Sequence, residues 1–447
     1  MTNNSLDSDI SQLLNEDITV SHEKWSAPKK LITLFVLSYV FFYMFPYPLS
    51  EIPLITVIVS FYSKAIEYIT LFLGRNVLGL TFEKIEVTGS GDTTFDYVSL
   101  ITILILSLIV SVVVYIITRK QKNYSRLYNY IIVYARYYLA LFLLSYGFAK
   151  VIGGQFSSPE FSQLEKTYGN SSPMNLLWTF MGYSKAYTMF SGFGEVLGGI
   201  LLFFRRTTVM GCLVTIAIML NVVMLNFSYD VPVKLFSCHL VLIALFIVSP
   251  YIKKLTDFFI FQRTSNLHFK KMQFTKKWVR VTRMTVKALI IISFPVYMVV
   301  ESVQALNEYS EKSSINQRYL IQTFVRNEST SDNKAVSKKD TLLSNDPVKW
   351  NRVAFRKELI TITPVSGNSM NYLYNMDSLK NKLTLTRADN SGVKYELDYK
   401  FPSDSQMILS GLYEGDSIYA VMKKKNLNDY LLLNRGFHWI NEYPYNR

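Results

Sequence analysis

An acid, a base and an imidazole lie close together in the stretch NFSYDVPVKLFSCHL, which separates two long apolar segments. They are Asp230, Lys234 and His239. Such groups serve in general acid–base catalysis or polarise a bound ligand. Asp230 also precedes Val231 and Pro232 in the pattern of a helix N-cap, and Lys234 follows one turn later, where it can pair with Asp230. His239 falls off that stripe, so this helix alone does not assemble a triad.

The flanking apolar segments indicate an integral membrane protein. The chain has 447 residues, of which 50% are hydrophobic and 15% aromatic. A hydrocarbon core of roughly 30 Å needs about 20 mostly apolar helical residues. We therefore expect a membrane α-helical bundle of about seven transmembrane helices. They cover residues 31–49, 98–118, 130–152, 180–204, 207–228, 233–250 and 285–301.

The net charge of +14 comes mostly from basic residues between the predicted helices. The positive-inside rule places such clusters in the cytoplasm. The clusters precede the first helix, follow the second and the fourth, and fill the loop over 252–284. We therefore expect a multi-pass protein of the bacterial cytoplasmic (inner) membrane with its N-terminus inside and its C-terminal domain periplasmic. Its basic loops attract membrane lipids rather than nucleic acid.

Glu195, Arg136 and Lys150 are charged residues inside predicted helices, where a charge costs at least about 2.5 kcal/mol and needs a partner or a task. Glu195 lies near mid-bilayer, judged from its separation from Arg205. Arg136 lies in the cytoplasmic part of the third helix, so an ion pair with Glu195 is one expectation. Lys150, near the outer end of that helix, can snorkel to the interface. Glycines around Glu195 let a helix or a ligand approach closely; they are Gly192, Gly194, Gly198 and Gly199.

Several further polar residues fall in the outer half of the predicted bundle together with Lys234 and His239. In a packed bundle they can line a polar pocket that opens outward, with Glu195 at its floor as the catalytic residue. The alternative is a set of scattered hydrogen bonds between helices. The predicted substrate-binding residues are Arg136, Lys150, Tyr183, Tyr187, Asn221, Asn226, Asp230, Lys234 and His239.

The cysteines and histidines argue against two kinds of chemistry. Cys212 and Cys238 differ in predicted depth by about 15 Å, whereas a disulfide needs Cα atoms within about 7 Å. We therefore expect no dithiol mechanism. The four histidines are dispersed and no HExxH motif occurs, so we expect no protein-bound metal.

Two stretches outside the predicted helices have patterns of their own. Residues 52–80 are apolar but interrupted by Lys64 and Glu67, so this stretch lies along the interface or re-enters partway. Beyond Glu301 the period becomes two, as in VKYELDYKF. We expect a C-terminal extracytoplasmic all-β barrel or sandwich there, with further strands near 318–326, 350–363, 370–376 and 429–440 and a long loop over 327–346.

These patterns divide the chain into six parts. We expect a cytoplasmic tail over 1–30, two transmembrane helices and their connection over 31–129, a four-helix domain over 130–251, a basic loop over 252–284, a seventh helix over 285–301 and the β domain over 302–447.

Three motifs carry a resemblance to a known family. RYYLALFLLSYGFAK, GEVLGGILLFFRR and NVVMLNFSYDVPVKLFS resemble DoxX-like membrane proteins, whose four-helix domain is shared with MauE-type and thiosulfate:quinone oxidoreductase small subunits. The terminal LLLNRGFHWINEYPYNR and the β domain resemble a longer Bacteroidetes-type branch. The resemblance implies quinone-linked or redox-maturation chemistry, but the chain lacks the close cysteine pair of the redox-maturation pattern.

Two functions follow as expectations. The first is a DoxX-like membrane protein whose outward-facing pocket binds a quinone or lipid in a redox-linked envelope process. The second is a non-enzymatic anchor whose β domain recruits an envelope protein partner.

Overall fold

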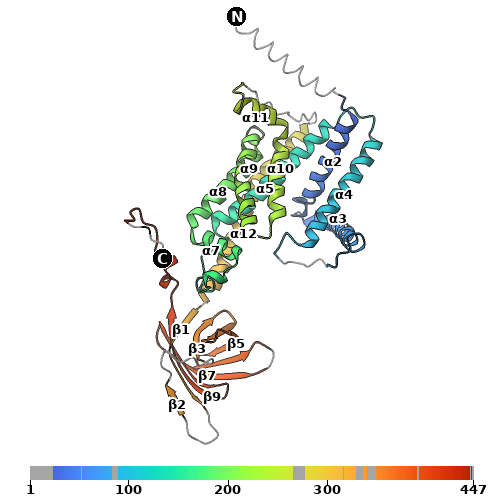
Figure 1. The fold of residues 1–447 in the computed structure, drawn as a ribbon. Helices are drawn as coiled ribbons and strands as arrows, with labels where there is room; N and C mark the ends of the chain where they lie inside the picture. The colour runs from blue at the N-terminus through green and yellow to red at the C-terminus, as the bar shows by residue number, and fades with distance from the viewer. Residues whose placement is uncertain are drawn as a thin grey trace. The chain divides into compact units, whose positions relative to one another are not determined.

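A computed structural model of the protein describes residues 24–51, 53–82, 89–264, 277–315, 317–328, 336–339, 349–389, 392–442 and 444. It divides into a helical unit and a β unit (Figure 1). The helical unit comprises residues up to 155, 172–177 and 186–302, and the β unit takes 156–171, 178–185 and the chain from 303 onward.

The helices confirm the predicted membrane class. Eight of those described are long and apolar enough to cross a membrane. The predicted 180–204 helix is broken at Ser184 into two. The helices are α2 (Ala27–Met44), α3 (Pro53–Phe72), α4 (Thr94–Ile117), α5 (Ser125–Ile152), α6 (Phe161–Leu164), α7 (Pro173–Tyr183), α8 (Lys185–Phe203), α9 (Thr208–Ser228), α10 (Lys234–Val248), α11 (Ile252–Phe259), α12 (Lys277–Ile315) and α13 (Leu431–Asn434).

Helices α2 and α4 lie side by side and run antiparallel (Figure 1). The start of α2 meets the segment after α4, because Trp25 N donates to Lys122 O at 3.0 Å and Lys30 Nζ to Gln121 O at 2.5 Å. The end of α2 and the start of α4 therefore lie at the same end of the bundle, and the segment that contains α3 connects them there.

The basic segments gather at the opposite end, where α2 begins. Tyr128, at the start of α5, shares a hydrogen bond of 2.8 Å with Ser249 at the end of α10. Lys287, early in α12, lies 5.2 Å from the ring centre of Phe204 at the end of α8. Residues 119–126, 205–206 and 253–254 therefore fall at one end of the helical unit.

The core of the helical unit is formed mainly by α5 and α10. Helix α5 buries Leu139, Ala140 and Leu144, and α10 buries Ala244 and Ile247. The remaining apolar surfaces of the bundle are exposed, as expected for helices in lipid.

The C-terminal part of the chain is all-β, as the period-two pattern predicted, and of the two forms left open by the sequence, barrel or sandwich, it is a closed antiparallel barrel. Strands β1 and β3 to β9 pair in sequence order, and β1 pairs with β9 to close the ring. The small core includes Trp350, Tyr372 and Tyr413, with the last two hydroxyls 2.6 Å apart. The strands are β1 (Gln317–Glu328), β2 (Val336–Lys339), β3 (Trp350–Phe355), β4 (Leu359–Pro364), β5 (Met370–Asp377), β6 (Lys382–Arg387), β7 (Lys394–Ser403), β8 (Gln406–Tyr413) and β9 (Asp416–Lys425).

Some strand predictions were wrong in detail. The predicted strand over 350–363 is a hairpin of β3 and β4. The predicted 327–346 loop contains β2, and its residues 329–335 and 340–346 lie outside the described part of the chain. No strand forms over 429–440, where the chain makes the short α13 and then exposes Phe437 and Trp439.

The connection between α5 and α7 belongs to the β unit through Glu165. This buried carboxylate contacts Arg318 of β1 at 2.5 Å and Arg352 of β3 at 3.0 Å. The Tyr430 hydroxyl donates to it at 2.8 Å. Burial alone would raise the pKa of Glu165, but these hydrogen bonds and cationic partners outweigh burial and place the pKa below its ordinary value.

Candidate functional site

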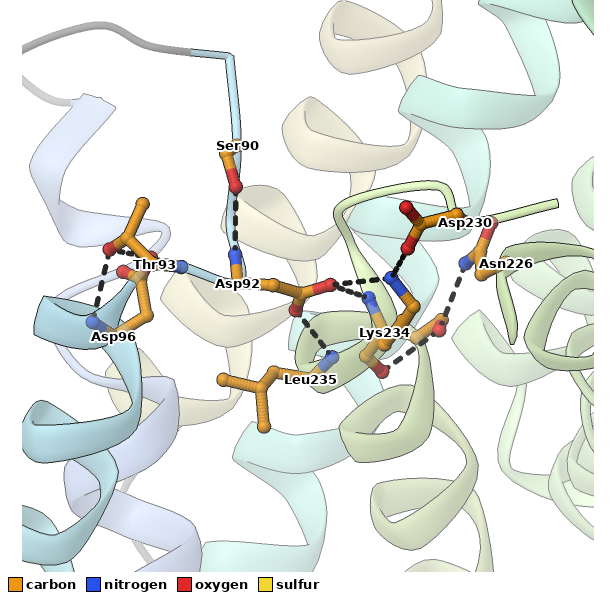
Figure 2. A network of polar contacts seen from close by, with 9 residues as sticks. Ser90, Asp92, Thr93, Asp96, Asn226, Asp230, Lys234 and Leu235 are labelled. Carbon is orange, nitrogen blue, oxygen red and sulfur yellow. Dashed lines mark hydrogen bonds and ion pairs between the residues drawn. The ribbon is translucent and has the colours of Figure 1, made fainter. Parts of the chain in front are cut away.

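The start of α10 is held by a residue far away in the sequence. Asp92 accepts from Lys234 N at 2.7 Å and from Leu235 N at 2.9 Å (Figure 2). A carboxylate there satisfies two free backbone donors and complements the helix dipole. Gly91 N also donates to Pro232 O at 2.8 Å, so the segment before α4 lies against the start of α10.

The predicted N-cap role of Asp230 is therefore wrong. Asp230 has a left-handed φ of 50° and a side chain that is 83% exposed. The expected pairing is present, since Lys234 Nζ lies 2.8 Å from Asp230 Oδ1 and 3.9 Å from Asp92 Oδ2 (Figure 2). Lys234 thus bridges the loop after α9 to the segment before α4.

His239 points from α10 toward α2. Its Nδ1 lies 2.7 Å from Leu235 O, and its Nε2 lies 2.6 Å from the Tyr39 hydroxyl. The Tyr43 ring stacks on the imidazole with ring centres 3.9 Å apart. Because a carbonyl only accepts, Nδ1 donates, and a neutral imidazole then accepts from Tyr39 through Nε2.

Beside His239 lies a cavity of about 380 Å³. It sits between α2, α4, α5 and the start of α10, at the end of the bundle where α4 begins. Its size is within the range of small-ligand pockets, and its wall combines aromatic rings with a few polar groups. The lining residues are Tyr43, Gly91, Asp96, Ser99, Leu100, Ile103, Phe142, Tyr146, Val233, Leu235, Phe236 and His239.

Asp96 is the carboxylate at this cavity. Its Oδ2 accepts from Thr93 N at 2.8 Å and from Thr93 Oγ1 at 2.6 Å, in a capping box that starts α4. Among the described residues, no donor reaches its Oδ1. Asp96 can therefore accept a hydrogen bond from a molecule in the cavity.

Glu195 is paired with Lys150, and the expected Arg136–Glu195 pair is wrong. Lys150 Nζ lies 2.8 Å from Oε1 and 2.7 Å from Oε2 of Glu195, and both side chains are buried. Lys150 therefore does not snorkel. Its ammonium lies 5.6 Å from the ring centre of Tyr146, which lines the cavity. Neither member of the pair is itself a lining residue, so Glu195 does not form the floor of this cavity.

Glycines bring α5 and α8 together around that pair. A Cβ on Gly192 would lie 2.8 Å from Gly147 O, and one on Gly199 would lie 3.0 Å from Ala140 O. Gly194 and Gly198 instead face Ile218 and Thr215 of α9. The sequence left open whether a helix or a ligand lies beside these glycines. Neighbouring helices fill the space.

Arg136 binds backbone instead of a carboxylate. Its Nε and a terminal nitrogen donate to Leu202 O at 3.2 and 2.9 Å. Leu202 lies in the last turn of α8, whose carbonyl lacks a helical partner. A cation at this position also complements the negative end of the helix dipole.

The other predicted binding residues do not converge on the cavity. Asn226 is buried and donates to Ser237 Oγ at 3.0 Å, a contact between α9 and α10. Asn221 is exposed on α9. Tyr187 is 38% exposed in the helical unit, and Tyr183 is 40% exposed in the β unit. Of the ten predicted site residues, His239 alone lines the described cavity.

The sequence reasoning missed Asp92, Asp96, Tyr39 and Tyr43. The capping pattern from Thr93 to Asp96 was readable, because a Thr three residues before an Asp is a known helix start. Tyr39 and Tyr43 share one face of α2 at helical spacing, but the sequence does not say which helix faces them.

Comparison with known proteins gives a bacterial relative. No family model and no solved structure matches the chain. A protein of Bacillus subtilis strain 168, described as the uncharacterized protein YwoB, is 36% identical over 115 residues, which are 25% of this chain and 71% of that protein. The chain belongs to the family of YwoB. Because YwoB is itself described only as uncharacterized, membership of the YwoB family supplies no activity, and the resemblance to DoxX-like proteins stays a prediction.

Proposed function

We propose that this chain is a bacterial cytoplasmic-membrane protein that binds an amphiphile with a hydrogen-bonding ring, a quinone or a similar lipid, in a redox-linked process of the cell envelope. The observation that carries the proposal is the aromatic cavity beside His239. Phe142, Tyr146 and Phe236 offer surfaces on which a flat ring packs. Asp96 accepts from a ligand hydroxyl, and the Ser99 hydroxyl can donate to a ligand carbonyl.

The charge distribution supports an outward-facing cavity. Basic segments occupy the end of the bundle where α2 begins, and the cavity lies at the end where α4 and α10 begin. The positive-inside rule then assigns the cavity to the outer side. Helix α12 starts near Phe204 at the basic end, so the barrel that follows it is assigned to the outer side too.

Glu195 does not line the cavity, so in this proposal it does not contact the ligand. It reaches the cavity only through the Lys150 ammonium and the Tyr146 ring. In this proposal Glu195 is therefore a positioning residue that holds the Lys150 ammonium beside Tyr146, and the predicted proton-carrying role is not retained; Glu195→Gln tests the positioning role. Loss of ligand binding in a folded variant supports that role, and unchanged binding rejects it.

A cavity-filling variant tests the ligand site. Ile103 lines the cavity, so Ile103→Trp places a bulky ring inside it. Ile105 lies on the same helix and is 41% exposed, so Ile105→Trp is the control that places the same ring outside the cavity. With the full chain in nanodiscs, we expect Ile103→Trp to weaken binding of a short-chain menaquinone or ubiquinone at least about tenfold, a cost of about 1.4 kcal/mol. Ile105→Trp should bind like the unmodified protein. Equal binding by both variants would reject the site.

The exposed tail favours a second candidate, a scaffold that recruits an envelope protein. Phe437, Trp439 and Ile440 are 76%, 90% and 77% exposed, and a cluster of exposed apolar side chains is typical of an interaction site. A complementation assay separates the two functions. Deletion after Glu301 should abolish a scaffold function, whereas Ile103→Trp should abolish a ligand-dependent one.

A further inference from the structure

Helix α3 has one face that packs on the bundle. Val59 and Thr70 are buried. The ring of Tyr62 meets Phe45, just after α2, with ring centres 4.7 Å apart. These contacts hold one side of α3 against the neighbouring helices.

The second face of α3 is polar. Thr56, Ser60, Ser63, Lys64 and Glu67 follow the spacing that places residues on one side of a helix. Thr56, Ser63 and Lys64 are exposed. Lys64 stands near the middle of α3, so this polar stripe is not confined to a helix end.

The third face is apolar and exposed. It is formed by Val57, Ile58, Phe61, Tyr68 and Phe72, which are 63%, 71%, 71%, 73% and 53% exposed. At 100° per residue this arc lies apart from both the polar and the packed arcs. A helix with three such faces fits a place where protein, water and hydrocarbon meet.

The course of the chain points to the same place. Helices α2 and α4 run antiparallel, so the end of α2 and the start of α4 lie at one end of the bundle. Gly74, just after α3, lies beside Val98 near the start of α4, because a Cβ on Gly74 would lie 3.6 Å from that side chain, so the end of α3 lies there too. In Figure 1, α3 is seen nearly end-on while α2 and α4 run across the view. We propose that α3 lies flat in the membrane interface at the cavity end of the bundle, with its third face in the acyl chains of one leaflet and its polar face in water.

A spanning α3 is disfavoured although its length and composition allow one. With one face packed, a spanning helix would turn Lys64 toward hydrocarbon near mid-membrane, at a cost of about 2.5 kcal/mol or more. It would also require α2 and α4 to run in the same direction. An interfacial α3 avoids both conflicts and leaves seven crossings.

Fluorescent labels on single cysteines test the depth of α3. In the full chain with Cys212→Ala and Cys238→Ala, an environment-sensitive label is attached at Phe61→Cys, at Ser63→Cys or, as a spanning control, at Ile105→Cys in the middle of α4. The protein is reconstituted in bilayers whose lipids carry bromine either near the head group or near the midplane. We expect the label at 61 to be quenched best by shallow bromine, the label at 105 best by deep bromine, and the label at 63 by neither.

Each result decides the proposal. Deep quenching at 61 like that at 105 would mean that α3 spans, and would overturn it. Absence of quenching at 61 would mean that water or a second copy covers this face, and would overturn it too. Tyr68→Cys, on the same face, replaces Phe61→Cys if that variant does not fold. A water-soluble maleimide should react with Ser63→Cys and not with Ile105→Cys.

Discussion

The Lys150 ammonium donates to both carboxylate oxygens of Glu195, joining α5 to α8 in the interior of the helical unit. The pair lies where Gly147 and Gly192 bring the two backbones together. A buried ion pair adds little over an apolar replacement, but removal of one partner leaves an uncompensated charge. We therefore infer that the main effect of the ion pair is to select α5 as the packing partner of α8, and that its net contribution to stability is small.

Removal of either charge alone should cost more than removal of both. We expect Lys150→Met and Glu195→Leu each to lower the free energy of unfolding by about 3 kcal/mol, and the double variant to cost clearly less than their sum. Unfolding in mixed micelles titrated with SDS measures these values. A double-mutant cycle of Arg136→Met and Glu195→Leu should give an interaction energy between the two side chains below about 0.5 kcal/mol. Strong coupling to Arg136 would contradict the pairing.

Asp92 should matter more for stability than Asp230. Asp92→Ala removes the acceptor of two backbone donors at the start of α10, for which we expect a cost of about 1–2 kcal/mol. Asp230→Ala removes a mostly exposed partner of Lys234 and should cost less than about 0.5 kcal/mol. Hydrogen exchange at the Lys234 and Leu235 amides should rise in Asp92→Ala only. Equal costs for the two variants would contradict the assigned cap.

The sequence predicted the class of the helical part and of the β part because periodicity is local. Apolar runs gave the bundle, and the alternation around Tyr395 and Leu397 gave antiparallel strands. The cavity was missed because it depends on which helices are neighbours. Asp92 and Lys234 are 142 residues apart, and no local pattern joins them. The membrane depth of each residue was estimated from its position along the helix, without the length of its side chain. The long Lys150 side chain extends from near the helix end to Glu195, so this pair was missed.

Close packing of α5 on α8 predicts that Gly192 tolerates no side chain. The added Cβ of Gly192→Ala would meet Gly147 O at 2.8 Å, and backbone cannot give way as a flexible side chain does. We expect a loss of about 1–3 kcal/mol in SDS titration. Gly169→Ala is the matched control, because nothing lies within 4 Å of its added Cβ. An unchanged Gly192→Ala protein would show that the two helices can separate freely.

The Glu165 cluster predicts an acid-sensitive attachment of the α5–α7 connection to the barrel. The pKa of Glu165 lies below its ordinary value of 4.5 in the folded protein. Its contribution is therefore complete above that ordinary value and is lost as the pH falls through the lower, folded value. We expect the free energy of unfolding to be constant in this respect above pH 4.5 and to fall as the pH is lowered further. The free energy of unfolding of the barrel is measured by urea titration, with Trp350 fluorescence as the signal in a variant whose other four tryptophans are replaced by Phe. Glu165→Gln should remove this acid dependence, whereas the exposed Glu358→Gln should keep it. An identical acid dependence in both variants would rule out Glu165 as its source.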